Sequence, residues 1–121
     1  MENEEKDLES GELARELVRA ISDKKGSDIV LFDVRAVSVL ADYFIICSGD
    51  TERQVKAIVD DVIERAKDLG FKPLQTEGAP ASGWMVLDYG NIIAHIFLPP
   101  QRDYYQLEEL WSDAQLVVRI Q

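Results

Sequence analysis

The chain has 121 residues, enough for one domain of ordinary size around one hydrophobic core. With 46% hydrophobic and 30% charged residues it has the composition of a soluble globular domain, and its longest apolar runs are too short to cross a bilayer. The net charge of −10 disfavours broad binding to the phosphate backbone of nucleic acids and favours basic partners, with a role in solubility as the alternative.

The two ends of the chain differ from the patterned middle. The first residues are rich in acids and resemble neither a secretory signal nor a transit peptide, so we expect a cytoplasmic protein. We interpret residues 1–9 as an acidic tail, residues 10–113 as one domain and residues 114–121 as a second tail. No internal repeat divides the domain.

The first half of the domain predicts a helix followed by two buried strands. Apolar residues at four-residue spacing indicate a helix with Ser10 as its candidate N-cap: Leu13, Leu17 and Ile21. The segments Ile29–Val34 and Tyr43–Cys47 are apolar on both alternate sets of positions, which is typical of strands covered on both faces. These two segments should be the central strands of a sheet.

The clearest local signal is the start of a second helix. The sequence Thr51-Glu52-Arg53-Gln54 has the form of a capping box, and Gly70 follows the last apolar position. The apolar stripe between them consists of Val55, Ile58, Val59, Val62, Ala66 and Leu69. We therefore predict a helix from Thr51 to Leu69 and, after it, a short strand near Pro73–Thr76.

The last part of the domain predicts a hairpin and a short helix. The runs Trp84–Tyr89 and Asn91–Leu98 flank a turn at Gly90. Two prolines end the second run, and a helix beginning near Arg102 or Asp103 would place Leu107, Leu110 and Trp111 on its apolar side. The resulting order, αββαβββα, indicates an α/β sandwich with a mixed sheet.

Few residues in the chain could carry chemistry. One cysteine, Cys47, lies in an apolar strand pattern, and one cysteine with one histidine cannot form a zinc site. His95 is better explained as a structural or interface hydrogen-bonding residue than as a general base, since no nucleophile lies near it in sequence. The loop Ser48–Thr51 precedes a helix, so an anion site there stays an alternative. We predict no catalytic residue, metal or cofactor.

Aromatic side chains near the hairpin are more informative. Trp84 follows a glycine-containing loop, the turn carries Asp88 and Tyr89, and Tyr105 lies in the final helical segment. Aromatic residues beside polar loops are typical of protein-docking edges. We therefore predict that the partner-binding residues are Trp84, Asp88, Tyr89, Asn91, His95 and Tyr105.

Several separated motifs in the domain resemble the Iojap proteins, also called ribosomal silencing factors. The resemblance rests on Asp42–Gly49, Arg53–Val55, Trp84 with Asp88–Gly90, His95–Phe97 and Leu110–Asp113, and it extends from Leu13 to Asp113. It implies a fold similar to that of nucleotidyltransferases. It also implies a repressor that binds the large ribosomal subunit through large-subunit ribosomal protein fourteen, blocks joining of the small subunit and damps translation when nutrients are short.

The resemblance leaves some points open. The family frequently has an acid where this chain has Asn91, so a charge contact is not carried over at that position. The alternative function is a nucleotidyltransferase-like enzyme or a nucleotide-binding module, but the Asp-x-Asp pair that such enzymes use near two metal ions is absent. We expect no membrane association and little direct binding to nucleic acid, and the free protein is either a monomer or a homodimer.

Overall fold

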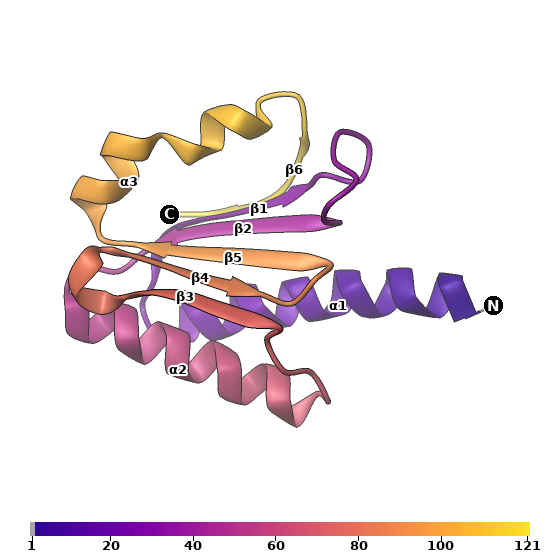
Figure 1. The fold of residues 1–121 in the computed structure, drawn as a ribbon, viewed down its shortest axis with the longest axis horizontal. Coiled ribbons are helices and arrows are strands. Elements are labelled where there is room, and N and C mark those ends of the chain that lie inside the picture. The colour runs from indigo at the N-terminus through magenta and orange to yellow at the C-terminus, as the bar shows by residue number, and fades with distance from the viewer. Residues whose placement is uncertain (1) are drawn as a thin grey trace.

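The structure is a computed structural model that describes the backbone of residues 2–121 and the side chains of residues 10–121. A six-stranded mixed sheet is covered by α1 and α2 on one face and by α3 with a 3₁₀ helix on the other (Figure 1). The helices are α1 (Glu2–Asp23), α2 (Glu52–Asp68) and α3 (Pro99–Tyr105), with 3₁₀ turns η1 (Pro80–Ser82) and η2 (Leu107–Trp111).

The strands follow the order β3-β4-β5-β2-β1-β6 across the sheet. Their bounds are β1 (Ser27–Asp33), β2 (Tyr43–Ser48), β3 (Gln75–Ala79), β4 (Trp84–Asp88), β5 (Ile92–Phe97) and β6 (Gln115–Ile120). Among the strands of the described residues, only β2 and β5 pair in parallel. The predicted mixed α/β architecture is confirmed, and β1 and β2 lie inside the sheet as expected.

The predicted C-terminal tail, residues 114–121, is wrong, because β6 occupies most of that segment. It pairs antiparallel with β1, with Ile120 opposite Ile29 and Gln115 opposite Asp33. Four β-branched or aliphatic residues within six positions suit a strand, and the free edge of β1 supplies the partner. The order αββαβββα therefore gains a ninth element, a terminal strand.

The N-terminal helix also differs from its prediction. Helix α1 begins at Glu2 rather than near Ser10, and Ser10 lies buried within it. The Ser10 hydroxyl accepts a hydrogen bond from the Asn91 side chain at 3.3 Å, so it ties the helix to the β4–β5 turn instead of capping it. Met1 and the side chains of residues 2–9 lie outside the described residues, so the role of the acidic segment stays a prediction.

The start of α2 confirms the predicted N-cap and adds a cross-link. Thr51 Oγ1 accepts a hydrogen bond from the Gln54 N–H at 3.1 Å. The Gln54 side chain accepts from the Asp50 N–H at 2.6 Å and donates to the carbonyls of Lys24 and Lys25 at 3.2 and 2.9 Å. Gln54 thus closes the helix start and holds it against the turn between α1 and β1.

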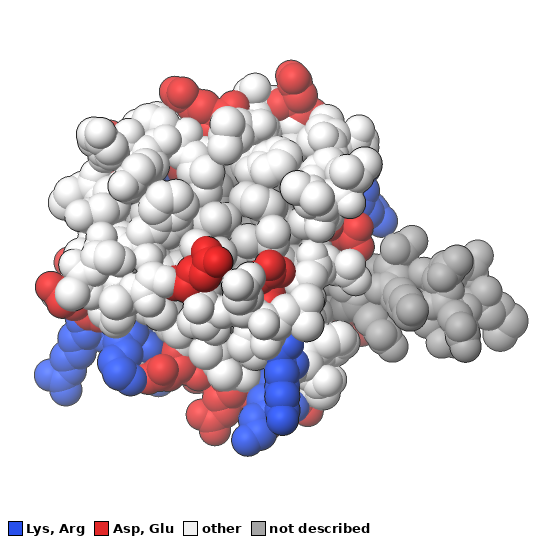
Figure 2. All heavy atoms as spheres, viewed as in Figure 1, with Lys and Arg blue, Asp and Glu red and all other residues white. Residues whose placement is uncertain are grey.

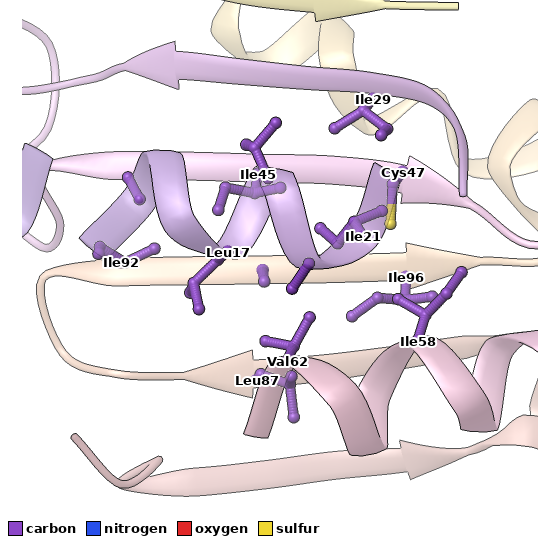
Figure 3. Packing of buried hydrophobic residues seen from close by; sticks show 14 of the residues in the cluster. Leu17, Ile21, Ile29, Ile45, Cys47, Ile58, Val62, Leu87, Ile92 and Ile96 are labelled. Carbon is purple, nitrogen blue, oxygen red and sulfur yellow. The ribbon is translucent and has the colours of Figure 1, made fainter. Parts of the chain in front are cut away.

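The main core lies between the sheet and the two long helices (Figure 3). Leu17 and Ile21 of α1 and Ile58 of α2 are completely buried, and so are the strand residues Ile45 and Ile96 that lie opposite them. Burying one such side chain stabilises a fold by about 1.5–3 kcal/mol. This face of the sheet therefore supplies most of the hydrophobic stabilisation.

The second face is covered by α3 and η2 over only part of its width. Phe97, Ile46 and Phe32 form its buried apolar cluster, against which Leu107 and Trp111 pack. Helix α3 begins at Pro99 rather than near Arg102 because proline is accommodated in the first turn of a helix, where its missing N–H is not needed. The Pro99-Pro100 pair starts the helix as well as ending β5.

Arg102 fastens α3 to the end of the sheet. One of its guanidinium nitrogens donates to the Asp28 carbonyl at 2.6 Å and to the Ser48 hydroxyl at 3.0 Å, and Nε donates to Glu108 at 3.4 Å. Asp28 lies at a bulge in β1 with φ of 47°. The bulge thus offers Arg102 a carbonyl, and Arg102 ties α3 to the ends of β1 and β2.

Candidate functional site

Strand alternation puts the predicted docking residues of β4 on the face opposite the long helices. Trp84, Val86 and Asp88 are half-buried, whereas Met85 and Leu87 between them are buried in the main core. Alternate side chains of a strand point to opposite faces of a sheet. The side chains of β4 that do not contribute to the main core therefore point to the face that α3 covers only in part.

The register of the sheet shows which residues share that face. In one cross-strand row Glu77 pairs with Val86 and Val86 with His95, and in the next Gln75 pairs with Asp88 and Asp88 with Ile93. Residues that lie directly opposite each other on paired strands project to the same face. We call this set the open face: Gln75, Glu77, Trp84, Val86, Asp88, Ile93 and His95, with Phe44 of β2 beside Ile93.

An aromatic cluster borders the open face where α3 begins to cover the sheet. The ring centroid of Trp84 lies 4.6 Å from that of Tyr105 and 5.0 Å from that of Phe97. Phe44 lies 5.0 Å from His95 and 4.5 Å from Trp111. Tyr105 is 49% exposed, so the cluster has an accessible aromatic edge. Large rings of this kind supply contact area at protein interfaces.

His95 is the buried polar residue at the centre of this region. It is 7% exposed, and its Nδ1 accepts a hydrogen bond from Trp84 Nε1 at 3.1 Å. Burial lowers the pKa of His95 to about 4, because the charged imidazolium would lose its hydration. The imidazole is therefore neutral at neutral pH, and it acts as a hydrogen-bonding group rather than a charge.

The formal charges of the open face are all negative. Its ionisable members other than His95 are Glu77 and Asp88. Asp88 Oδ1 accepts from the Gly90 N–H at 2.7 Å, so one carboxylate oxygen shapes the turn while the half-buried side chain stays in contact with solvent. In Figure 2 most Lys and Arg side chains gather along the lower edge, where α1 and α2 lie in Figure 1. The open face thus offers aliphatic, aromatic and acidic groups together.

The structure separates the six predicted binding residues into two groups. Trp84, Asp88 and His95 belong to the open face, and Tyr105 contacts Trp84 at its border. Tyr89 instead packs against the main core, where burial raises the pKa of its hydroxyl to about 12. Asn91 donates to Ser10 of α1. These last two residues therefore organise the β4–β5 turn, and the predicted patch of six side chains is not one continuous surface.

Five members of the open face were not among the predicted residues. Val86 and Ile93 could have been found from the sequence, because each lies two positions from a predicted residue on its own strand. Gln75, Glu77 and Phe44 could not be found in this way, because they lie on β3 and β2, whose neighbours in the sheet are decided by the order β3-β4-β5-β2. The whole β3 strand was expected near Pro73–Thr76 and lies at Gln75–Ala79, which brings Glu77 into the face.

Other groups considered for chemistry are engaged in structure. Burial raises the pKa of the Cys47 thiol to about 12, so it is not a thiolate at neutral pH. At the start of α2, Gln54 occupies the Asp50 N–H and Thr51 occupies the Gln54 N–H, which removes two donors from the alternative anion site. Within residues 10–121 no cluster of three or more His, Cys, Asp or Glu is placed to hold a metal ion.

The fold and the open face together define a class of protein: a small mixed α/β domain with an acidic and aromatic surface on one face of its sheet. Residues 7–121 match the family model described as "Ribosomal silencing factor during starvation". The chain therefore belongs to the ribosomal silencing factor family, as its resemblance to the Iojap proteins predicted. This family is named for regulation of the ribosome and not for a catalysed reaction.

Individual relatives agree with this assignment. A ribosomal silencing factor from Halalkalibacterium halodurans is 36% identical over 110 residues, which cover 91% of this chain and 94% of the relative. The mouse protein "Mitochondrial assembly of ribosomal large subunit protein 1" is 31% identical over 99 residues, 79% of this chain and 43% of the relative. A crystal structure of a protein from Chromobacterium violaceum matches with a TM-score of 0.81 and 33% identity, covering 90% of both chains.

Two further expectations from the sequence concern the relationship to nucleotidyltransferases and the membrane. The relationship to nucleotidyltransferases stays a prediction, since the matched structure is described only by its source. Among the described residues, no helix combines the length and the apolar character that crossing a membrane requires.

Proposed function

We propose that this protein represses translation by binding the large ribosomal subunit through large-subunit ribosomal protein fourteen, which blocks joining of the small subunit when nutrients are short. The observation that carries the proposal is the open face, where two aliphatic residues and an aromatic cluster lie beside Glu77 and Asp88 with no Lys or Arg. The proposed compartment is the cytoplasm, where ribosomal subunits join.

Charge supports a basic protein as the direct partner. The whole chain carries −10, and the open face adds two carboxylates to a surface that has no cation of its own. Proteins that sit on ribosomal RNA are basic, and complementary potentials accelerate association and exclude wrong partners. Direct contact with the RNA backbone is disfavoured for the same reason. The mouse relative, whose name refers to the ribosomal large subunit, supports the choice of subunit.

Obstruction requires less from the site than catalysis does. A patch of about 800 Å² per partner suffices for a specific complex, and no group has to stabilise a transition state. A bound domain of 13.7 kDa would physically occupy part of the surface that the small subunit needs. The proposal therefore needs only an accessible complementary face, and the partly uncovered face of β3, β4 and β5 supports it.

Sedimentation of the purified protein with isolated subunits tests the proposal. We expect wild-type protein to sediment with large subunits and not with small subunits or joined ribosomes. Asp88→Lys should abolish most of this binding, because it places a cation against a basic partner. The matched control is Glu64→Lys on the exposed side of α2, which makes the same charge change outside the open face and should bind as wild type.

Two results would contradict the proposal. Equal sedimentation with both subunits would show that charge alone drives binding. Folded Asp88→Lys and Glu64→Lys variants with the same affinity would show that the docking surface lies elsewhere. Circular dichroism on each variant excludes misfolding as the cause of a loss.

A further inference from the structure

One buried side-chain nitrogen of the open face has no hydrogen-bond partner within the described part of the chain. His95 Nε2 is buried and has no hydrogen-bond partner among the described residues. The side chain is 7% exposed, so the atom is shielded from solvent as well. Buried polar groups in native proteins are nearly always hydrogen-bonded, and leaving one unpaired destabilises the free protein. An exception of this kind calls for a functional explanation.

The protonation state of His95 follows from its neighbour. Trp84 Nε1 is only a donor, and it lies 3.1 Å from His95 Nδ1. Nδ1 must therefore accept, which places the single proton of the neutral ring on Nε2. Burial favours the same neutral form. Trp84 thus selects the tautomer whose N–H is the unpaired donor.

A second unpaired donor lies in the same aromatic cluster. Trp111 Nε1 is also buried without a partner among the described residues. The ring of Phe44 contacts both His95 and Trp111, with centroid separations of 5.0 and 4.5 Å. Two buried N–H donors therefore flank one half-buried ring at the border of the open face.

We propose that His95 is a specificity-determining hydrogen-bond donor, whose Nε2–H pairs with a main-chain carbonyl oxygen of the basic partner, and that Trp84 is its positioning residue. This inference rests on the proposed function. A neutral acceptor is the chemistry that fits, since Glu77 lies in the same cross-strand row and Asp88 in the next, where both would repel a carboxylate. Side-chain rotation on binding, which is common at interfaces, would uncover Nε2.

Substitutions of His95 should change the affinity for large subunits without lowering the stability of the free protein. His95→Phe keeps an aromatic ring but removes the Nε2 donor, and it also removes the acceptor of Trp84 Nε1. One unpaired donor is thus exchanged for another, so the free protein should melt near the wild-type temperature while affinity for isolated large subunits falls about tenfold. His95→Gln restores an amide N–H close to the position of Nε2 and should recover part of the affinity. A purely structural histidine would give the opposite pattern, with lower stability and an affinity unchanged among folded variants.

Nuclear magnetic resonance of the free protein tests the tautomer independently. The chain has one histidine, so the imidazole ¹⁵N signals belong to His95 without assignment. We expect the Nε2–H tautomer at neutral pH in wild type and a mixture of tautomers in Trp84→Phe, which keeps a ring but lacks the donor. An imidazolium or the Nδ1–H tautomer in the wild-type protein would overturn the proposal, whatever the binding data show.

The binding experiment distinguishes this inference from the proposed function. Wild-type binding with a tenfold loss in folded His95→Phe and partial rescue in His95→Gln would support both. Wild-type binding that folded His95→Phe retains in full would overturn the role of His95 and leave the proposed function standing. Absence of wild-type binding to large subunits would overturn both.

Discussion

The two faces of the sheet differ in the kind of side chain they carry and in how completely they are covered, although their residues alternate along the same strands. The face under α1 and α2 is filled by aliphatic side chains such as Leu17, Ile45 and Ile96, all completely buried. The other face carries aromatic rings, a neutral buried histidine and two carboxylates, and α3 covers only part of it. Most of the hydrophobic stabilisation therefore comes from the face under α1 and α2. The fold can then tolerate half-buried and unpaired groups on the other face.

This division has a consequence at the level of single residues. Trp84 and Met85 are neighbours in β4, yet Trp84 contacts Tyr105 at the open face and Met85 lies in the main core. Substitutions at successive positions of β4 and β5 should therefore change different properties. Even-numbered positions of β4 should affect binding, and odd-numbered positions should affect the free energy of unfolding.

The largest expected effect is the loss of stability on the helix-covered face. Ile45→Ala removes a completely buried side chain from β2 and should lower the free energy of unfolding by about 2–5 kcal/mol, because a cavity adds to the lost burial. Urea denaturation measures this loss. Binding of the fraction that remains folded should match wild type. A stability loss below that of Val86→Ala on the open face would contradict the assignment of the two faces.

Trp84→Ala should produce the reverse pattern. Truncating an aromatic anchor in a desolvated interface commonly costs about 2 kcal/mol or more, which is roughly a thirtyfold weakening of affinity. Titration of labelled protein against large subunits measures it. Leu69→Ala at the exposed end of α2 is the matched control for removing apolar surface outside the open face. If both variants bind equally, the aromatic cluster is structural.

Lowering the pH should reduce the free energy of unfolding, because His95 of the open face is buried in its neutral form. The pKa of His95 is about 4 in the folded protein and about 6.5 in the unfolded chain, so the unfolded state binds the extra proton first. The stability contribution is complete above pH 6.5 and declines as pH falls toward 4. The expected loss is about 2 kcal/mol at pH 5, given 1.36 kcal/mol per pKa unit.

The pH dependence is measured as the urea midpoint of wild type and of His95→Phe between pH 7 and pH 5. Subtracting the variant removes the contribution of carboxylates, which titrate in both proteins. Identical pH dependence in the two proteins would show that His95 is solvated in the folded state. Over residues 10–121, the buried cluster under α1 and α2 contains no Asp, Glu or His, so the comparison also distinguishes the two faces.

The smallest expected effect concerns the cap of α2. Thr51→Ala removes the acceptor of the Gln54 N–H and should destabilise the domain by roughly 0.5–2 kcal/mol. Affinity for large subunits should fall only as far as the folded fraction falls. If the variant keeps its melting temperature but loses binding, the segment from Ser48 to Gln54 contacts the partner directly, and the role of Thr51 is not only structural.

Much of the local structure could be predicted because it depends on nearby residues. The cap at Thr51, the hairpin around Gly90 and the buried strands each have a short-range signal in propensity or periodicity. The site was predicted less completely. Trp84, Asp88, His95 and Tyr105, which were predicted from the aromatic and polar residues of the hairpin and the final helical segment, do lie together. Tyr89 and Asn91 were grouped with them because proximity in sequence does not reveal which way a turn residue points.

By itself, the amino-acid sequence determined the class of fold, the family, the acidic charge and the elements that local periodicity encodes. Only the tertiary structure decided that residues 115–120 form β6, because a short strand at the end of the chain needs the edge of β1 to pair with. Tertiary structure also decided that Glu77 and Phe44 join the open face and that His95 accepts from Trp84. The physical reason is that strand order and register bring together residues far apart in the chain, and no local pattern specifies those pairings.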